Sequence, residues 1–97
     1  MANDNPRGHG ATERLTTAEQ DFRDQERVLR EVLETYPESF TLAELTRELT
    51  IASTDFMERD RIERAVRDLI AGGLLHLVGD LVLPTRAAAN FHSLSEV

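Results

Sequence analysis

Apolar residues recur along this chain with two different periods, and the changes of period divide it into helices and a hairpin. Across residues 17–36, 42–49 and 56–71 they return every three or four positions, the spacing of an amphipathic helix. Two short apolar runs then flank Gly79-Asp80, as in a β-hairpin, and a last helical pattern follows Pro84. The pattern predicts a mainly α fold with a small β-hairpin, of α+β class: a three-helix core, the hairpin and a C-terminal helix.

The first helix is predicted to begin at Thr16 or Thr17, each three residues before a Glu or Gln, the spacing of a capping box, and to end at Pro37. One stripe is predicted to face the core: Ala18, Phe22, Leu29, Val32, Leu33 and Tyr36, with Gln25 as its polar member. The other face alternates acids with arginines, for example Glu26 and Arg30 at i,i+4. That face could bind a partner, but we interpret it as a solvated surface.

The second helix is predicted to begin at Thr41, which has capping-box spacing to Glu44, after an extended link long enough for one bridging strand. Its buried residues are predicted to be Leu42, Leu45 and Leu49, with Thr46 and Arg47 outward. After a turn, Thr54 or Asp55 caps the third helix. Its core stripe is predicted to be Ile62, Ala65, Val66, Leu69 and Ile70.

The outward face of the third helix carries the candidate contacts to nucleic acid. Arg64 and Arg67 lie one turn apart on this face, beside Asp60, with Arg61 on one flank. This spacing suits contacts to a DNA groove or to phosphates. Residues 53–72 contain four arginines and five acids, however, a net charge of −1. A face that neutralises its own charges is therefore an equal alternative.

The hairpin is apolar on both faces. Gly72-Gly73 ends the third helix, and a two-residue loop at Gly79-Asp80 pairs Val78 with Leu81. One face then carries Leu75, Leu77, Val82 and Pro84, and the other carries Leu74, His76, Val78, Leu81 and Leu83. Because a half-exposed hairpin normally alternates apolar with polar residues, we expect the second face to be covered. We interpret His76 as a packed histidine with one hydrogen-bond partner, in preference to a pH sensor or ligand.

The cover for that face has two candidates, the C-terminal segment of the same chain and a second subunit. Thr85 is predicted to cap a last helix that carries Phe91 and Leu94 as large apolar groups at i,i+3 spacing. This helix either folds over its own hairpin or reaches across to a second copy.

Length and composition limit the alternatives. A chain of 97 residues with 40% hydrophobic content forms at most one small domain, predicted here as residues 15–94 after a flexible tail at 1–14 and before a frayed end at 95–97. Cysteine is absent, which excludes disulfides and thiolate sites, and no run of 18 apolar residues occurs. We expect a soluble cytoplasmic protein without membrane contact.

No catalytic or cofactor motif is recognisable. The sequence has no glycine-rich phosphate loop, HExxH, paired histidines or serine elbow, and His9 lacks a partner at metal-ligand spacing. We expect no enzyme, no cofactor and no metal. The net charge of −7, from 18 acids against 11 arginines without any lysine, disfavours nucleic-acid binding, because phosphate contacts need a basic surface.

Three stretches together resemble the winged helix-turn-helix superfamily of bacterial regulators, as in MarR-like and ArsR-like domains. FTLAELTREL resembles the first helix of the helix-turn-helix, IERAVRDLIAGGLL the recognition helix with its exit, and HLVGDLVLPTRAA a wing followed by a capped helix. The resemblance covers roughly residues 17–94 and implies a small, dimeric transcriptional regulator that binds double-stranded DNA. It would place the third helix in the major groove. The implied DNA contacts are Arg47, Thr54, Arg61, Arg64 and Arg67.

The alternative is an acidic winged-helix module that dimerises or docks a protein partner without binding DNA. The short turn of the hairpin carries Asp80 and no cation, and the hairpin is apolar on both faces. The predicted interface consists of Leu74, His76, Val78, Leu81, Leu83, Phe91 and Leu94.

Overall fold

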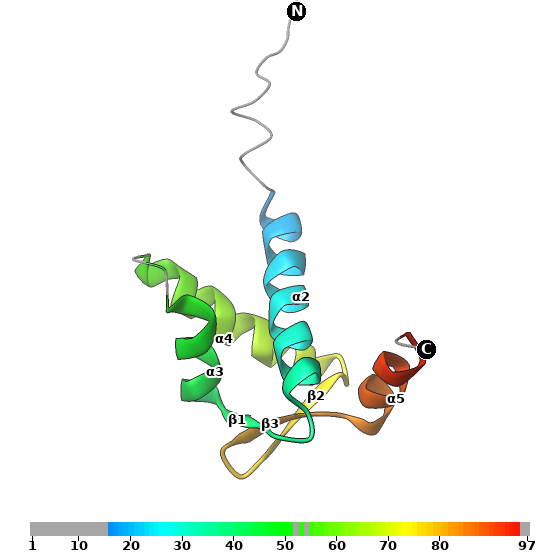
Figure 1. The fold of residues 1–97 in the computed structure, drawn as a ribbon. Helices are drawn as coiled ribbons and strands as arrows, with labels where there is room; N and C mark the ends of the chain where they lie inside the picture. Colours follow the sequence, from blue (N-terminus) through cyan, green and yellow to red (C-terminus); the bar gives the residue numbers. More distant parts are fainter. Residues whose placement is uncertain (1–15, 52, 54, 96–97) are drawn as a thin grey trace, which may run out of the picture.

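The structure, a computed structural model, describes residues 16–51, 53 and 55–95. In this part of the chain, four helices and a three-stranded antiparallel sheet form an α+β fold (Figure 1). The elements are α2 (Thr17–Thr35), β1 (Phe40–Thr41), α3 (Leu42–Thr50), α4 (Phe56–Ala71), β2 (Leu75–Val78), β3 (Leu81–Pro84) and α5 (Arg86–Ser95). The predicted tail at 1–14, the predicted cap Thr54 and the last two residues lie outside the described residues.

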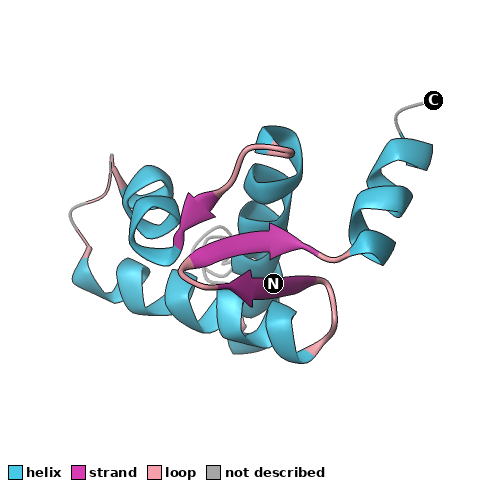
Figure 2. Cartoon of the chain, turned by 90° about the horizontal axis from the view of Figure 1, so that it is seen from below, coloured by secondary structure: helices cyan, strands magenta, loops and turns pink. Residues whose placement is uncertain are grey.

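The sheet has the order β1-β3-β2, and Figure 2 shows its three strands from below. The two-residue loop gives the predicted register, with Val78 opposite Leu81 and Leu77 opposite Val82. The predicted bridging strand is also present, because Phe40 pairs with Val82. The hairpin is therefore joined to the segment that precedes α3.

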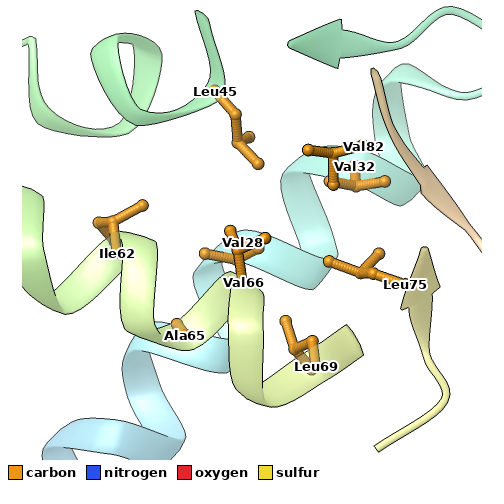
Figure 3. Close-up of a cluster of buried hydrophobic side chains, with 9 residues drawn as sticks. All are labelled: Val28, Val32, Leu45, Ile62, Ala65, Val66, Leu69, Leu75 and Val82. Carbon is orange, nitrogen blue, oxygen red and sulfur yellow. The ribbon is translucent and has the colours of Figure 1, made fainter. Parts of the chain in front are cut away.

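The core lies between α2, α3, α4 and the inner side of the sheet (Figure 3). Its buried side chains are Val28, Val32, Leu45, Ile62, Ala65, Val66, Leu69, Leu75 and Val82. The predicted stripes of α3 and α4 supply most of them, with Leu42, Leu49 and Ile70 packed at the margin. The core thus holds one face of α4 and leaves the opposite face in solvent.

Local hydrogen bonds explain where the helices begin and end. Thr16 with Glu19 and Thr41 with Glu44 form the two predicted capping boxes. At the end of α4, the Leu74 N–H donates to the Leu69 carbonyl at 3.0 Å, and Gly73 has a φ of +83°. This pattern is a Schellman motif, which turns the chain directly into β2.

The predicted core stripe of α2 is wrong for half of its six apolar members, Ala18, Phe22 and Tyr36, which are exposed, while Leu29 packs at the margin of the core. Val32 is buried, but Phe22 is 67% exposed and Tyr36 is also exposed, while Val28 and Asp24 are buried instead. Residues 24, 28 and 32 follow one another at i,i+4, so they share a face about a quarter-turn away from the predicted stripe. α2 has two apolar faces, and it packs on α4 through the narrower one.

One further residue of α3 lies where the pattern did not place it, whereas a predicted cap of α4 is confirmed. Thr46, predicted to point outward, is buried, and its hydroxyl oxygen has no hydrogen-bond partner among the described residues. Asp55 caps α4 by accepting from the Met57 N–H at 2.9 Å. Glu58 does not return a hydrogen bond to the Asp55 N–H, which donates to the Ser53 hydroxyl at 3.0 Å; the Glu58 carboxylate binds Arg27 of α2 instead.

Candidate functional site

The outward face of α4 is the first candidate surface. Arg64 and Arg67 are both exposed on it, as predicted, and Asp60 and Asp68 are exposed beside them. The Arg64 guanidinium lies 3.9 Å from the Asp21 carboxylate of α2, whereas Arg67 forms no ion pair with any described residue. Two arginines and two aspartates leave this face without net charge.

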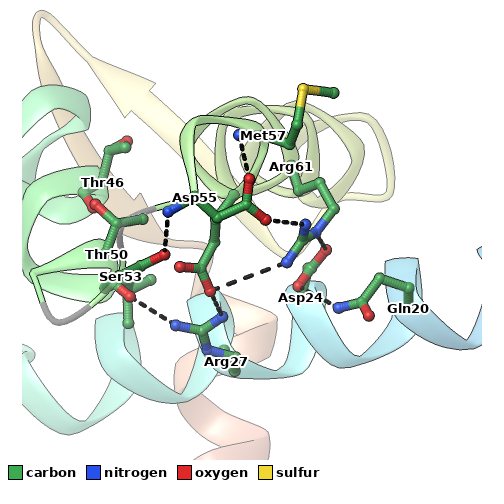
Figure 4. Close-up of polar contacts among 11 residues, drawn as sticks. Gln20, Asp24, Arg27, Thr46, Thr50, Ser53, Asp55, Met57 and Arg61 are labelled. Carbon is green, nitrogen blue, oxygen red and sulfur yellow. Dashed lines mark hydrogen bonds and ion pairs between the residues drawn. The ribbon is translucent and has the colours of Figure 1, made fainter. Parts of the chain in front are cut away.

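Arg61, predicted as a DNA contact, lies in a partly buried ion-pair network between α2 and α4 (Figure 4). Its Nε donates to Asp24 Oδ2 at 3.2 Å, and the Asp24 side chain is only 1% exposed. Gln20 donates a second hydrogen bond to the same carboxylate at 3.0 Å. The charge of Asp24 is therefore both paired and hydrogen-bonded, which a buried carboxylate requires.

The other two nitrogens of Arg61 also face carboxylates. Its Nη1 lies 3.7 Å from Asp55 Oδ2, and its Nη2 lies 3.9 Å from Glu58 Oε2. All three guanidinium nitrogens are thus directed at acids of the same chain. Arg61 could reach a nucleic acid only by leaving these contacts.

Arg27 extends the network to α3. It donates to Glu58 Oε2 at 2.9 Å and to the carbonyl of Leu49, near the end of α3, at 2.6 Å. One side chain of α2 therefore joins the end of α3 to the beginning of α4. The network fixes the orientation of α4 relative to the rest of the fold.

The remaining predicted DNA contacts do not gather into a basic surface. Arg47 is exposed on α3, where Glu44 and Glu48 line the same shallow hollow. Thr54 lies outside the described residues. Cationic side chains on α3 and α4 thus alternate with acids.

The second candidate surface is the outer hairpin face, formed by Leu74, His76, Val78, Leu81 and Leu83. Leu74 and Leu81 are each 37% exposed and Val78 is 51% exposed. None of its five residues is an acid, a lysine or an arginine. Seen from below, no helix crosses in front of β2 and β3 (Figure 2).

The inner hairpin face matches its prediction except at one position. Leu75, Val82 and Pro84 are buried, but Leu77 is half exposed. Leu77 lies next to the loop, beyond the edge of the core, and lines a shallow hollow with Asp80 and the start of α3. His76, expected to be packed, is exposed on the outer face.

α5 does not cover the outer hairpin face. The prediction that the C-terminal helix folds over its own hairpin is therefore wrong. The Thr85 hydroxyl caps α5 as predicted, accepting from the Ala88 N–H at 3.3 Å and donating to the Gly73 carbonyl at 2.9 Å. Only Ala88 of this helix is buried, and Phe91 and Leu94 are each 73% exposed. Whether α5 reaches a second copy stays a prediction.

The pair between Arg61 and the buried Asp24 was not predicted, although the sequence contains a signal for it. Asp24 precedes Val28 and Val32 at successive intervals of four, so it belongs to their face. An acid on an apolar face requires a cation on the opposing helix. The arginine-rich α4 could have supplied that partner.

The described residues contain no group of three histidine, aspartate or glutamate side chains that could hold a metal ion. Within the same residues, no helix is long and apolar enough to cross a membrane. Comparisons with models of known families, with curated proteins and with solved structures give no match.

The first prediction concerns the buried pair. Arg61→Leu is expected to lower the free energy of unfolding by about 3 kcal/mol, because it leaves the Asp24 carboxylate buried without its cation. The matched change Arg30→Leu removes an exposed pair with Glu26 at 3.4 Å, and it should cost less than about 0.5 kcal/mol. Urea unfolding followed by circular dichroism measures both.

The double variant Asp24→Leu/Arg61→Leu completes that test. It should recover much of the loss, because no charge is left buried. Equal, small losses for Arg61→Leu and Arg30→Leu would contradict the buried pair.

The second prediction concerns the stability of the fold at low pH. A hydrogen bond from the Ser53 hydroxyl is the largest effect that lowers the pKa of Glu58 below its ordinary 4.5, and the Arg27 guanidinium lowers this pKa further. A carboxylate with a lowered pKa stabilises the fold above pH 4.5, and this contribution is lost as the pH falls through the lowered pKa. Glu58→Gln should therefore cost about 1 kcal/mol at neutral pH, and the difference from the wild type should shrink in acid.

Unfolding of both proteins by urea, repeated at several pH values between neutral and pH 3, measures this difference. Glu26→Gln, at an exposed position of α2, is the matched control. A Glu58→Gln deficit that is independent of pH would contradict the assigned role of Glu58.

Proposed function

We propose that this chain is a winged-helix domain that works as a protein-interaction module through its outer hairpin face. Support for the winged-helix assignment comes from the order of the elements. α3 and α4, joined by a turn, correspond to a helix-turn-helix, and β2 and β3 correspond to the wing. β1 pairs with the wing, and α5 follows it.

The observation that carries the function is the composition of the outer hairpin face. It is a strand surface of leucine, valine and one histidine in contact with solvent. Exposure of such a surface to water is unfavourable in an isolated chain, and burying it against a partner would lower the free energy. The inner face of the same hairpin already supplies the core, so the outer face is not needed to fold the domain.

The distribution of charge favours a protein partner over DNA. The outward face of α4 carries as many acids as arginines, and Arg61 is held by three carboxylates. Asp80 occupies the turn of the wing. Neutralisation of phosphates by cationic side chains supplies most of the affinity in nucleic-acid binding. These surfaces can neutralise few phosphates, because acids offset their arginines.

DNA binding is the second candidate function, and one observation favours it. Arg64 and Arg67 lie one turn apart, exposed, on the helix that would enter the major groove. Arg67 has no acid partner among the described residues. A bound duplex would gain two cationic contacts from this helix.

The third prediction tests DNA binding directly. The double variant Arg64→Ala/Arg67→Ala is compared with Arg23→Ala/Arg30→Ala, which changes the net charge equally on α2. We expect genomic fragments to be retarded weakly or not at all at about 0.15 M salt, with no difference between the two variants. Salt-dependent retardation that is lost only in Arg64→Ala/Arg67→Ala would establish the second candidate in place of the first.

The fourth prediction tests the outer hairpin face as a docking surface. Val78→Thr/Leu81→Thr should change the free energy of unfolding by less than about 1 kcal/mol, because both side chains lie on the outer face of the hairpin, where Val78 is 51% and Leu81 37% exposed. The matched pair Leu75→Thr/Val82→Thr places two hydroxyls in the core and should cost several-fold more. Urea unfolding of dilute protein measures both.

A fluorescent hydrophobic dye such as ANS supplies the second readout. Wild-type protein at low concentration should bind the dye, and Val78→Thr/Leu81→Thr should bind much less. If the outer pair destabilises the fold as much as the inner pair does, the outer face belongs to the core and the proposal fails.

A further inference from the structure

We propose that the occupant of the outer hairpin face is a second copy of this chain, seated sheet against sheet about a two-fold axis. This inference rests on the proposed function, since it names the partner of the same surface. It also assigns a role to α5, which follows the hairpin and carries two large apolar side chains, Phe91 and Leu94, each 73% exposed.

The exposed area fits the needs of a dimer. From the exposed fractions, the outer hairpin face offers roughly 300 Å² of surface per copy, too little for a stable interface by itself. Phe91 and Leu94, each 73% exposed, add roughly another 300 Å². Together they approach the ~800 Å² per partner of a standard interface, of which about 60% is apolar.

The charges fit a second copy better than a basic partner. Two chains of net charge −7 repel one another, and the repulsion at the contact is smallest where the surfaces that meet carry no acid. The outer hairpin face carries none, so an identical face can meet it without placing like charges opposite one another. A basic partner would instead be recognised through acids on the docking surface, which this face does not offer.

The geometry of a sheet suits such self-pairing. A two-fold interface uses the same patch on both copies, and two sheets pack face to face about 10 Å apart through their apolar sides. The hairpin would then lie between the helices of its own chain and the hairpin of the other. That position accounts for a two-stranded ribbon that is apolar on both sides.

The test is the mass of the 97-residue chain in solution. Sedimentation equilibrium should give two chains for the wild type and one chain for Leu81→Asp, with the dissociation constant raised at least about 100-fold. Met57→Asp makes the same kind of change at an exposed apolar position at the start of α4. It should leave the mass at two chains and the circular dichroism unchanged.

Two further variants protect the test against misfolding and locate the interface. The milder pair Val78→Thr/Leu81→Thr should also give one chain while keeping the helical signal of the wild type. Phe91→Ser/Leu94→Ser should weaken the dimer about tenfold or more, because it removes the α5 part of the contact. A dimer that survives both changes on the hairpin overturns the assignment of the outer face.

The outcomes separate this inference from the proposed function. A wild type that remains a single chain up to about 100 μM excludes the second copy. If that single chain binds ANS at the outer face, and Val78→Thr/Leu81→Thr abolishes the binding, the docking surface stands with a different occupant. A single chain that binds no dye removes both proposals.

Discussion

The two-residue loop at Gly79-Asp80 sets the register of the hairpin, and this register decides which apolar side chains enter the core. Gly79 has a φ of +63°, a conformation that glycine adopts without the strain of a Cβ. With the loop fixed, Leu75 and Val82 face the helices while Val78 and Leu81 face solvent. A shift by one residue would exchange the two sets, and the charge-free outer face would disappear into the core.

A second constraint, the partly buried ion-pair network between α2 and α4, determines which arginines remain on the surface. Asp24 binds Arg61, and Arg27 binds Glu58, so two arginines are used to hold helices together. The arginines left on the outside of α4 are matched by acids. The outside of α4 is therefore a nearly neutral helix face, whereas the outer hairpin face is an apolar strand surface that differs clearly from an ordinary solvated surface.

Local signals made much of this fold predictable from sequence. Thr41 with Glu44, the glycines after α4 and the loop at Gly79-Asp80 each act within a few residues, and the elements they delimit were confirmed. α2 was different, because it has two apolar faces, one with Phe22 and one with Val28. The choice between them depends on how α4 docks, which no local pattern contains. The role of Arg61 likewise depends on a distant residue, the acid 37 positions earlier with which it pairs. Whether α5 covers the outer hairpin face also depends on tertiary packing.

The most direct test of this account is the solvent exposure of individual leucine and valine methyl groups, measured by NMR with a soluble paramagnetic probe. In dilute protein, the methyl signals of Val78 and Leu81 should be strongly broadened by the probe, while those of Leu75 and Val82 should not. At concentrations where the mass doubles, the signals of Val78 and Leu81 should become protected. Protection of Val78 and Leu81 already in the single chain, or broadening of Leu75 and Val82, would contradict the account.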